Sequence, residues 1–193
     1  MDNLPKFEKP PVSETVMGAA FRADPLWNVT HFGLFYSRIQ ARYPKVELQP
    51  PLLDDVEDES RVPGIRFQLL SGAPDSRCWF IDQTDKHLLQ VQANRFLRNW
   101  RKREGGGDYP HYATNRAEFE RDWAAYLEFR EEMGLSAPEV RQCELTYINL
   151  LEQNQGWSNK GELHEVFRFW SNPGVAGILP LPEAAMFKLA FRL

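Results

Sequence analysis

The stretch HLLQVQANRFLRNWRKR, from His87 to Arg103, carries the clearest pattern in this chain of 193 residues. In its first half amide side chains alternate with apolar ones, and its second half is rich in arginine and aromatic residues. Alternation with a period of two is typical of a β-strand that buries one face. The pattern predicts a strand over residues 87–96, which continues into a basic loop.

Alternating segments before this strand extend the prediction to an antiparallel meander from about 62 to 100. Residues 65–69 and 77–82 alternate apolar and polar side chains, and the polar residues 83–86 have the length of a hairpin loop. Three more strands are predicted, at residues 12–22, at 45–51 as a short edge strand, and at 140–151.

Two amphipathic helices are predicted to cover the sheet. The first, at about 25–43, has aromatic and aliphatic residues at spacings of three and four, which form one apolar stripe. The second, at about 115–133, begins at Asn115 as its N-cap, with Glu118 completing a capping box. Its apolar face is predicted to consist of Phe119, Trp123, Tyr126, Leu127 and Met133.

These elements predict an α+β fold with a mainly antiparallel sheet, and their order resembles two strand-helix-strand halves. The main domain is predicted to span residues 1–153. Residues 154–193 are expected to form a C-terminal extension or the start of a second half. Their apolar alternating segment at 187–193 indicates either a truncated chain or a strand that joins an existing sheet edge.

The composition argues against several classes of protein. Hydrophobic residues make up 42% and aromatic residues 13%, which is typical of an ordered globular chain with a large core. The net charge of -4 argues against non-specific coating of nucleic acid. Neither a secretory leader nor a run of about 18 apolar residues occurs, so we expect a cytoplasmic protein with Cys78 and Cys143 as buried, reduced thiols.

The first candidate binding feature is a row of amides. Gln90, Gln92 and Asn94 stand at alternate positions, so their side chains would share one face of an extended strand. Such a row can read the hydrogen-bond pattern of a ligand or of a partner's backbone. The alternative is the ordinary solvent-facing side of an antiparallel sheet.

A basic and aromatic patch follows the amide row. Arg95, Arg98 and Arg101 flank Asn99 and Trp100. Guanidinium groups beside an aromatic plane could engage the phosphates and bases of a nucleic acid, or an acidic protein surface. In the alternative interpretation Trp100 packs inward and the charges keep the end of the strand soluble.

Glu144, on the predicted strand 140–151, would lie near the amides and Arg95 if the two strands were neighbours. That position would suit a structural charge-assisted hydrogen bond as well as a ligand contact. A lone glutamate is weak support for acid–base chemistry, so no catalytic residue is predicted. The four histidines lack zinc-ligand spacing, and no phosphate-binding glycine motif occurs. Neither a metal nor a cofactor is therefore predicted.

Four short motifs occur in order, namely QxQ at 90–92, RFxxNWR at 95–101, YPxY at 109–112 and ELxYxN at 144–149. With this combination the chain resembles a sporadically distributed prokaryotic family of uncharacterised proteins. The resemblance implies a prokaryotic, cytoplasmic origin. A patchy distribution is typical of accessory genes, including defence and toxin–antitoxin loci. The family transfers no activity, cofactor or catalytic residue.

The leading hypothesis is a non-enzymatic protein-interaction module of such an accessory system, with a protein partner and no membrane association. The second is a nucleic-acid-binding protein that uses the patch from Arg95 to Arg103. The third is an enzyme or small-ligand binder with a polar cleft around Gln90, Gln92 and Glu144.

Overall fold

The computed structural model describes residues 10–52, 76–104, 109–151 and 158. The chain divides into two compact units, Met1–Asn149 and Leu150–Leu193. Every described helix and strand belongs to the first unit. The predicted strands at 65–69 and 187–193 lie outside the described residues.

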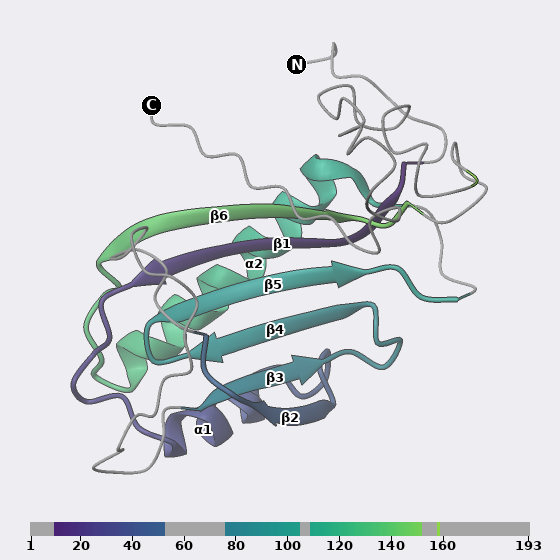
Figure 1. The fold of residues 1–193 in the computed structure, drawn as a ribbon. Helices are drawn as coiled ribbons and strands as arrows, with labels where there is room; N and C mark the ends of the chain where they lie inside the picture. Colours follow the sequence, from purple (N-terminus) through teal and green to yellow (C-terminus); the bar gives the residue numbers. More distant parts are fainter. Residues whose placement is uncertain (1–9, 53–75, 105–108, 152–157, 159–193) are drawn as a thin grey trace, which may run out of the picture. The chain divides into compact units, whose positions relative to one another are not determined.

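In the described part of the chain six strands form one antiparallel sheet, so the predicted α+β class with an antiparallel sheet is confirmed (Figure 1). Their order across the sheet is β2-β3-β4-β5-β1-β6. The strands are β1 (Val12–Phe21), β2 (Lys45–Gln49), β3 (Arg77–Ile81), β4 (His87–Gln92), β5 (Arg95–Arg101) and β6 (Val140–Asn149). Among the described residues, β2 and β6 are the two edges of the sheet.

The predicted strand over residues 87–96 is in fact two strands, β4 and β5, joined by a turn at Ala93 and Asn94. Gln92 pairs with Arg95 across this turn. The turn contains neither glycine nor proline, so the sequence has no strong signal that ends the first strand there. The segment expected to be a basic loop is therefore β5, which lies in the interior of the sheet.

Two helices, α1 (Thr30–Ile39) and α2 (His111–Glu132), pack on the same face of the sheet. Phe35 of α1 meets Phe80 of β3 edge to face, with ring centroids 5.8 Å apart. Tyr126 of α2 stacks on Phe96 of β5 at 4.8 Å. Aromatic side chains bury on the order of 150–250 Å² each, so these contacts supply much of the core that joins the helices to the sheet.

Both helices differ from their predicted bounds. α1 is shorter than 25–43, because the chain before it forms a turn in which Leu26 N–H donates to Asp24 Oδ1 (2.9 Å). α2 begins at His111, before the predicted cap, and Asn115 lies inside the helix. There Asn115 donates a hydrogen bond to Thr15 Oγ1 (3.2 Å), so it does not cap the helix.

The inner face of α2 is less apolar than predicted. Leu127 and Met133 are each 36% exposed, whereas Asp122 and Arg130 are buried. Hydrophobic periodicity alone does not reveal charged residues on an inner face, because such residues are usually solvated. Neither of the two helices in the described ranges has the length and apolar character needed to cross a membrane.

The two cysteines also differ from each other. Cys78 of β3 is buried in the core, as predicted, and burial raises its pKa to about 12. Cys143, which was also predicted to be buried, is exposed because it lies on the edge strand β6. Both thiols are free.

Candidate functional site

The residues of the sequence-predicted site are divided between the two faces of the sheet. Strand pairing aligns Gln90 with Leu97 and Leu88 with Asn99, so the amide side chains and Asn99 share the face opposite the helices. Arg98 and Trp100 alternate with Asn99 and therefore point to the helix side. The sequence-predicted patch from Arg95 to Arg103 is not one continuous surface for this reason.

Gln90 is the centre of a polar network on the face opposite the helices. Its Nε2 donates to Asn99 Oδ1 (2.8 Å), and Asn99 Nδ2 donates to Glu14 Oε1 (2.5 Å). Its Oε1 accepts hydrogen bonds from Arg77 Nη1 (2.6 Å) and Trp79 Nε1 (3.0 Å). Gln90 and Asn99 are only 6% and 3% exposed. Because their hydrogen-bonding groups are engaged inside the chain, the network stabilises the fold and presents little to a ligand.

The rest of the amide row is engaged in the same way. Gln92 accepts from Leu52 N–H (2.8 Å) and donates to Leu52 O (3.1 Å) and to Asn94 Oδ1 (2.9 Å). Asn94 belongs to the turn after β4, so the predicted row of three amides on one strand is wrong in its last member. Arg95, on the same face as Gln92, is 8% exposed.

Two arginines of the predicted patch remain accessible, namely Arg103 beyond the end of β5 and, on this face, the partly buried Arg101. The guanidinium of Arg101 lies 5.7 Å from the ring centre of Trp79, and that of Arg77 lies 5.5 Å from the same ring. Burial, together with a neighbouring arginine in each case, lowers the pKa of both guanidiniums. The indole is therefore engaged by two cations, which leaves little of it for stacking with a base.

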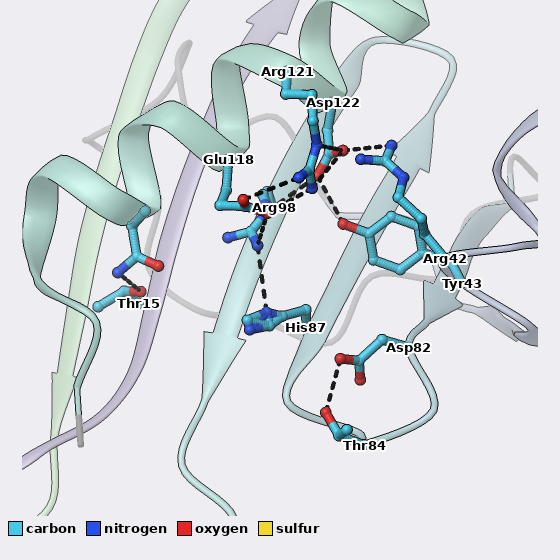
Figure 2. Close-up of polar contacts among 11 residues, drawn as sticks. Thr15, Arg42, Tyr43, Asp82, Thr84, His87, Arg98, Glu118, Arg121 and Asp122 are labelled. Carbon is cyan, nitrogen blue, oxygen red and sulfur yellow. Dashed lines mark hydrogen bonds and ion pairs between the residues drawn. The ribbon is translucent and has the colours of Figure 1, made fainter. Parts of the chain in front are cut away.

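Arg98 belongs to an ionic cluster on the helix side whose centre is buried (Figure 2). We call it the Asp122 cluster, and its members are Arg42, Tyr43, His87, Arg98, Glu118, Arg121 and Asp122. Asp122 Oδ2 accepts hydrogen bonds from Tyr43 Oη (2.7 Å) and Arg98 Nε (3.1 Å). Its Oδ1 pairs with Arg42 (2.7 Å). The carboxylate has no exposed surface and joins α2 to β5 and to the segment after α1.

Electrostatic effects in the Asp122 cluster follow from burial and from these partners. Burial and the neighbouring Asp122 carboxylate raise the pKa of Tyr43. Burial and the positive charge of Arg98 lower the pKa of His87, outweighing the acidic residues near it, which are Asp82, Glu118 and Asp122. Arg98 Nη2 lies 3.3 Å from His87 Nδ1. Both oxygens of Asp122 already have partners, so the arrangement is typical of a structural ion cluster rather than a catalytic base.

Glu144 does not lie near the amides, because its strand is not a neighbour of β4, as the prediction required. It pairs with Gly18 of β1, which pairs with Leu97 of β5, which pairs with Gln90 of β4. Three strand spacings separate Glu144 from Gln90, or about 14 Å. The described residues therefore form no polar cleft around Gln90, Gln92 and Glu144.

The edge strand β6 is exposed along most of its length, and the sequence did not predict it as a binding surface. Leu145, Tyr147 and Ile148 are 47%, 39% and 45% exposed. Register shifts near each end of the pairing with β1 leave Gln142 to Ile148 as its regular part. Exposed apolar side chains on an unpaired edge are a common template for association with another strand.

Hydrogen bonds at one end of β1 show which backbone groups of β6 point outward, away from the sheet. Phe21 N–H donates to Asn94 O on the β5 side, and Arg22 N–H donates to Glu139 O on the β6 side. Because backbone groups alternate sides along a strand, the even-numbered residues of β1 bond to β6. Their partners in β6 are also even-numbered. Cys143, Leu145 and Tyr147 therefore direct their N–H and C=O groups away from the sheet.

A groove of about 330 Å³ runs between β6 and α2 on the helix side. Its α2 wall combines the aromatic Tyr112, Phe119 and Trp123 with the charged Arg116 and Glu120, and its β6 wall includes Cys143 and Leu145. Such a lining suits apolar side chains that reach in from a neighbouring strand. We call the outer edge of residues 142–148 together with this groove the β6 surface.

The β6 surface has a partial signal in the sequence, since the alternation at 140–151 predicts the strand itself. What the sequence lacks is the order of strands, which makes β6 an edge. Among the described residues, no three His, Cys, Asp or Glu side chains are grouped closely enough to hold a metal ion. Comparisons of the chain with models of protein families, with curated proteins and with solved structures find no match.

Proposed function

We propose that this chain is a protein-interaction module that binds an extended segment of another chain along the β6 surface. The observation that carries the proposal is the exposed regular edge of β6, with apolar side chains beside outward-directed backbone groups. Strand addition of this kind obtains affinity from main-chain hydrogen bonds, and specificity from pockets that receive alternate side chains. The groove against α2 supplies such a pocket.

The contribution of each main-chain hydrogen bond is modest, about 0.5–1.5 kcal/mol net. The outward groups of Cys143, Leu145 and Tyr147 would therefore support a reversible association unless side chains add to it. Burial of apolar side chains adds roughly 25 cal/mol for each Å² removed from water. Leu145 lines the groove, and Tyr147 adds apolar area on the same side of β6.

The two other hypotheses have less support. A nucleic-acid site at Arg95–Arg103 needs Arg98 and Trp100 at the surface, and they are 3% and 4% exposed. An enzymatic or ligand-binding cleft needs Glu144 beside the amides, and two strands lie between them. As the setting of the interaction we propose the accessory, defence-related or antitoxin role that the family resemblance implies.

Selection of binders from a displayed library of random peptides tests the proposal. Leu145→Pro removes an outward N–H of β6 without removing a hydrogen bond to β1, and proline is tolerated at such edge positions. Selected peptides are expected to have alternating apolar residues and to lose most of their affinity for Leu145→Pro.

A matched control exists on the opposite edge of the sheet. Asp82 N–H donates to His87 O on the β4 side of β3, so Leu48 of β2 directs its N–H outward by the same alternation. Leu48 is 69% exposed. Leu48→Pro should leave peptide binding unchanged. Equal effects of the two proline variants, or failure to select any peptide with a chain that is monomeric, would contradict strand addition at β6.

A further inference from the structure

We infer that the chain that pairs with β6 is a second copy of this protein, aligned antiparallel about a twofold axis at Leu145. This inference rests on the proposed function and names the partner of the same surface. Most soluble oligomers are symmetric dimers in which the same patch of each subunit meets itself. A strand can do so only if its side chains are compatible with their own reversed order.

The regular part of β6 is centred on the proposed axis. Residues 142–148 lie between the two register shifts, and Leu145 is their midpoint. Pairing about Leu145 places this residue opposite its own copy. It also makes the outward-directed residues Cys143 and Tyr147 into hydrogen-bonded partners of each other across the axis, because each has its N–H and C=O groups on the outer side.

The side chains are compatible with this register. On the helix side Leu145 meets Leu145 of the second copy, and the large Tyr147 lies beside the small Cys143 at the mouth of the groove. On the opposite face Glu144 meets Thr146, and Gln142 meets Ile148. No two like charges stand opposite each other, whereas a shift of the axis to Glu144 would place two carboxylates together.

The helices leave room for such a pairing. α2 packs over β1 and β5, and a twofold axis perpendicular to the sheet would put both copies of α2 on one face. Counting strand spacings across the joined sheet, the two helix axes would lie about 20 Å apart, roughly twice the distance of packed helices. The helices therefore do not collide, and the two grooves would open into one space between them, lined by aromatic side chains and by Arg116 and Glu120 of each copy.

Analytical ultracentrifugation of the full chain over a range of concentrations tests the inference. The wild-type chain is expected to form dimers that dissociate on dilution, because an interface of one strand from each copy is small. Leu145→Lys should abolish the dimer, since it would place two ammonium groups at the axis. Leu48→Lys on the edge of β2 should leave it intact. Unfolding curves of both variants check that they fold.

Cross-linking fixes the register. In a Cys143→Ser background, Leu145→Cys should be joined to its copy by a short bis-maleimide, and Leu48→Cys in the same background should not. A wild-type chain that is monomeric at every concentration would overturn the inference, as would a dimer that persists in Leu145→Lys. If the chain is monomeric and selected peptides still bind in a Leu145→Pro-sensitive manner, only the second copy is excluded. If peptide binding fails as well, the proposed function fails with it.

Discussion

Removal of the buried carboxylate of Asp122 is expected to destabilise the fold strongly. Asp122→Ala leaves Arg98 Nε and Tyr43 Oη buried without their acceptor, and Arg98 has 3% of its side chain exposed. Breaking a buried ion pair by removal of one partner costs about 3–5 kcal/mol. Arg98 keeps Glu118 at 3.3 Å, but the Glu118 side chain is 34% exposed, so the compensation is partial.

The expected loss is large compared with the total. Single domains usually have a free energy of unfolding of about 5–15 kcal/mol, so the variant would lose roughly a fifth or more of the stability. For a unit of this size the melting temperature should fall by roughly 6–20 °C. Urea unfolding followed by tryptophan fluorescence measures the change directly.

Two further variants make the measurement decisive. Glu120→Ala removes an acidic residue from the same helix, but Glu120 pairs with Arg116 at the surface, where both side chains are more than half exposed. It should have little effect, because solvent screens exposed pairs. Replacing both Asp122 and Arg98 by leucine and methionine should restore much of the loss of Asp122→Ala. If Asp122→Ala is as stable as Glu120→Ala, the Asp122 cluster does not stabilise the fold and the reasoning is wrong.

Three other predictions concern pH, thiol reactivity and glycine. Because the pKa of His87 is lowered in the folded chain, protonation favours the unfolded state, and the melting temperature should fall as the pH drops below about 6.5. His87→Gln should flatten this part of the curve, and an unchanged slope would refute the assignment. Under native conditions a thiol reagent should modify the exposed Cys143. It should spare Cys78 until the chain unfolds, because Cys78 is buried and its pKa is raised to about 12. Two reactive thiols in the folded state would contradict this. Gly18→Ala should destabilise the chain, because a Cβ there would lie 2.9 Å from a carbonyl oxygen of β5. At Gly33 in α1 an added Cβ has no neighbouring atom within 4 Å, so Gly33→Ala should stabilise the helix by about 0.5–1 kcal/mol.

Periodicity predicts the parts of this fold in which side chains alternate between a buried and a solvated environment. The stripe of Phe32, Phe35 and Ile39 on α1 follows that rule. The strands β1, β3 and β6 form where strands are predicted, although β1 is buried along most of its length and β6 is mostly exposed. The rule fails at Ala93 and Asn94, where the chain reverses without glycine or proline. One missed turn moves β5 from a basic loop into the interior of the sheet.

The same limit explains why the candidate site changes. Arg98 and Asn99 are adjacent residues of one strand, so their side chains point to opposite faces of the sheet. The missed turn concealed that strand. Whether Glu144 meets Gln90 depends on the order of strands, which local sequence does not determine. The burial of Asp122 depends on Arg98 and Tyr43, residues that are far from it in the sequence and that only the tertiary fold brings to it.

A comparison of the two sheet edges supports the assignment of β6 as a surface for association. Proteins usually protect edge strands by making them short or charged. β2 has five residues, and two of them, Lys45 and Glu47, are charged. The regular part of β6 has a single charge, Glu144, over residues 142–148, and its irregularities lie outside that segment. An edge of that length, with exposed leucine, tyrosine and isoleucine, would promote aggregation unless another strand occupied it, so we expect Leu145→Lys to raise the solubility of the isolated chain and Leu48→Lys to leave it unchanged.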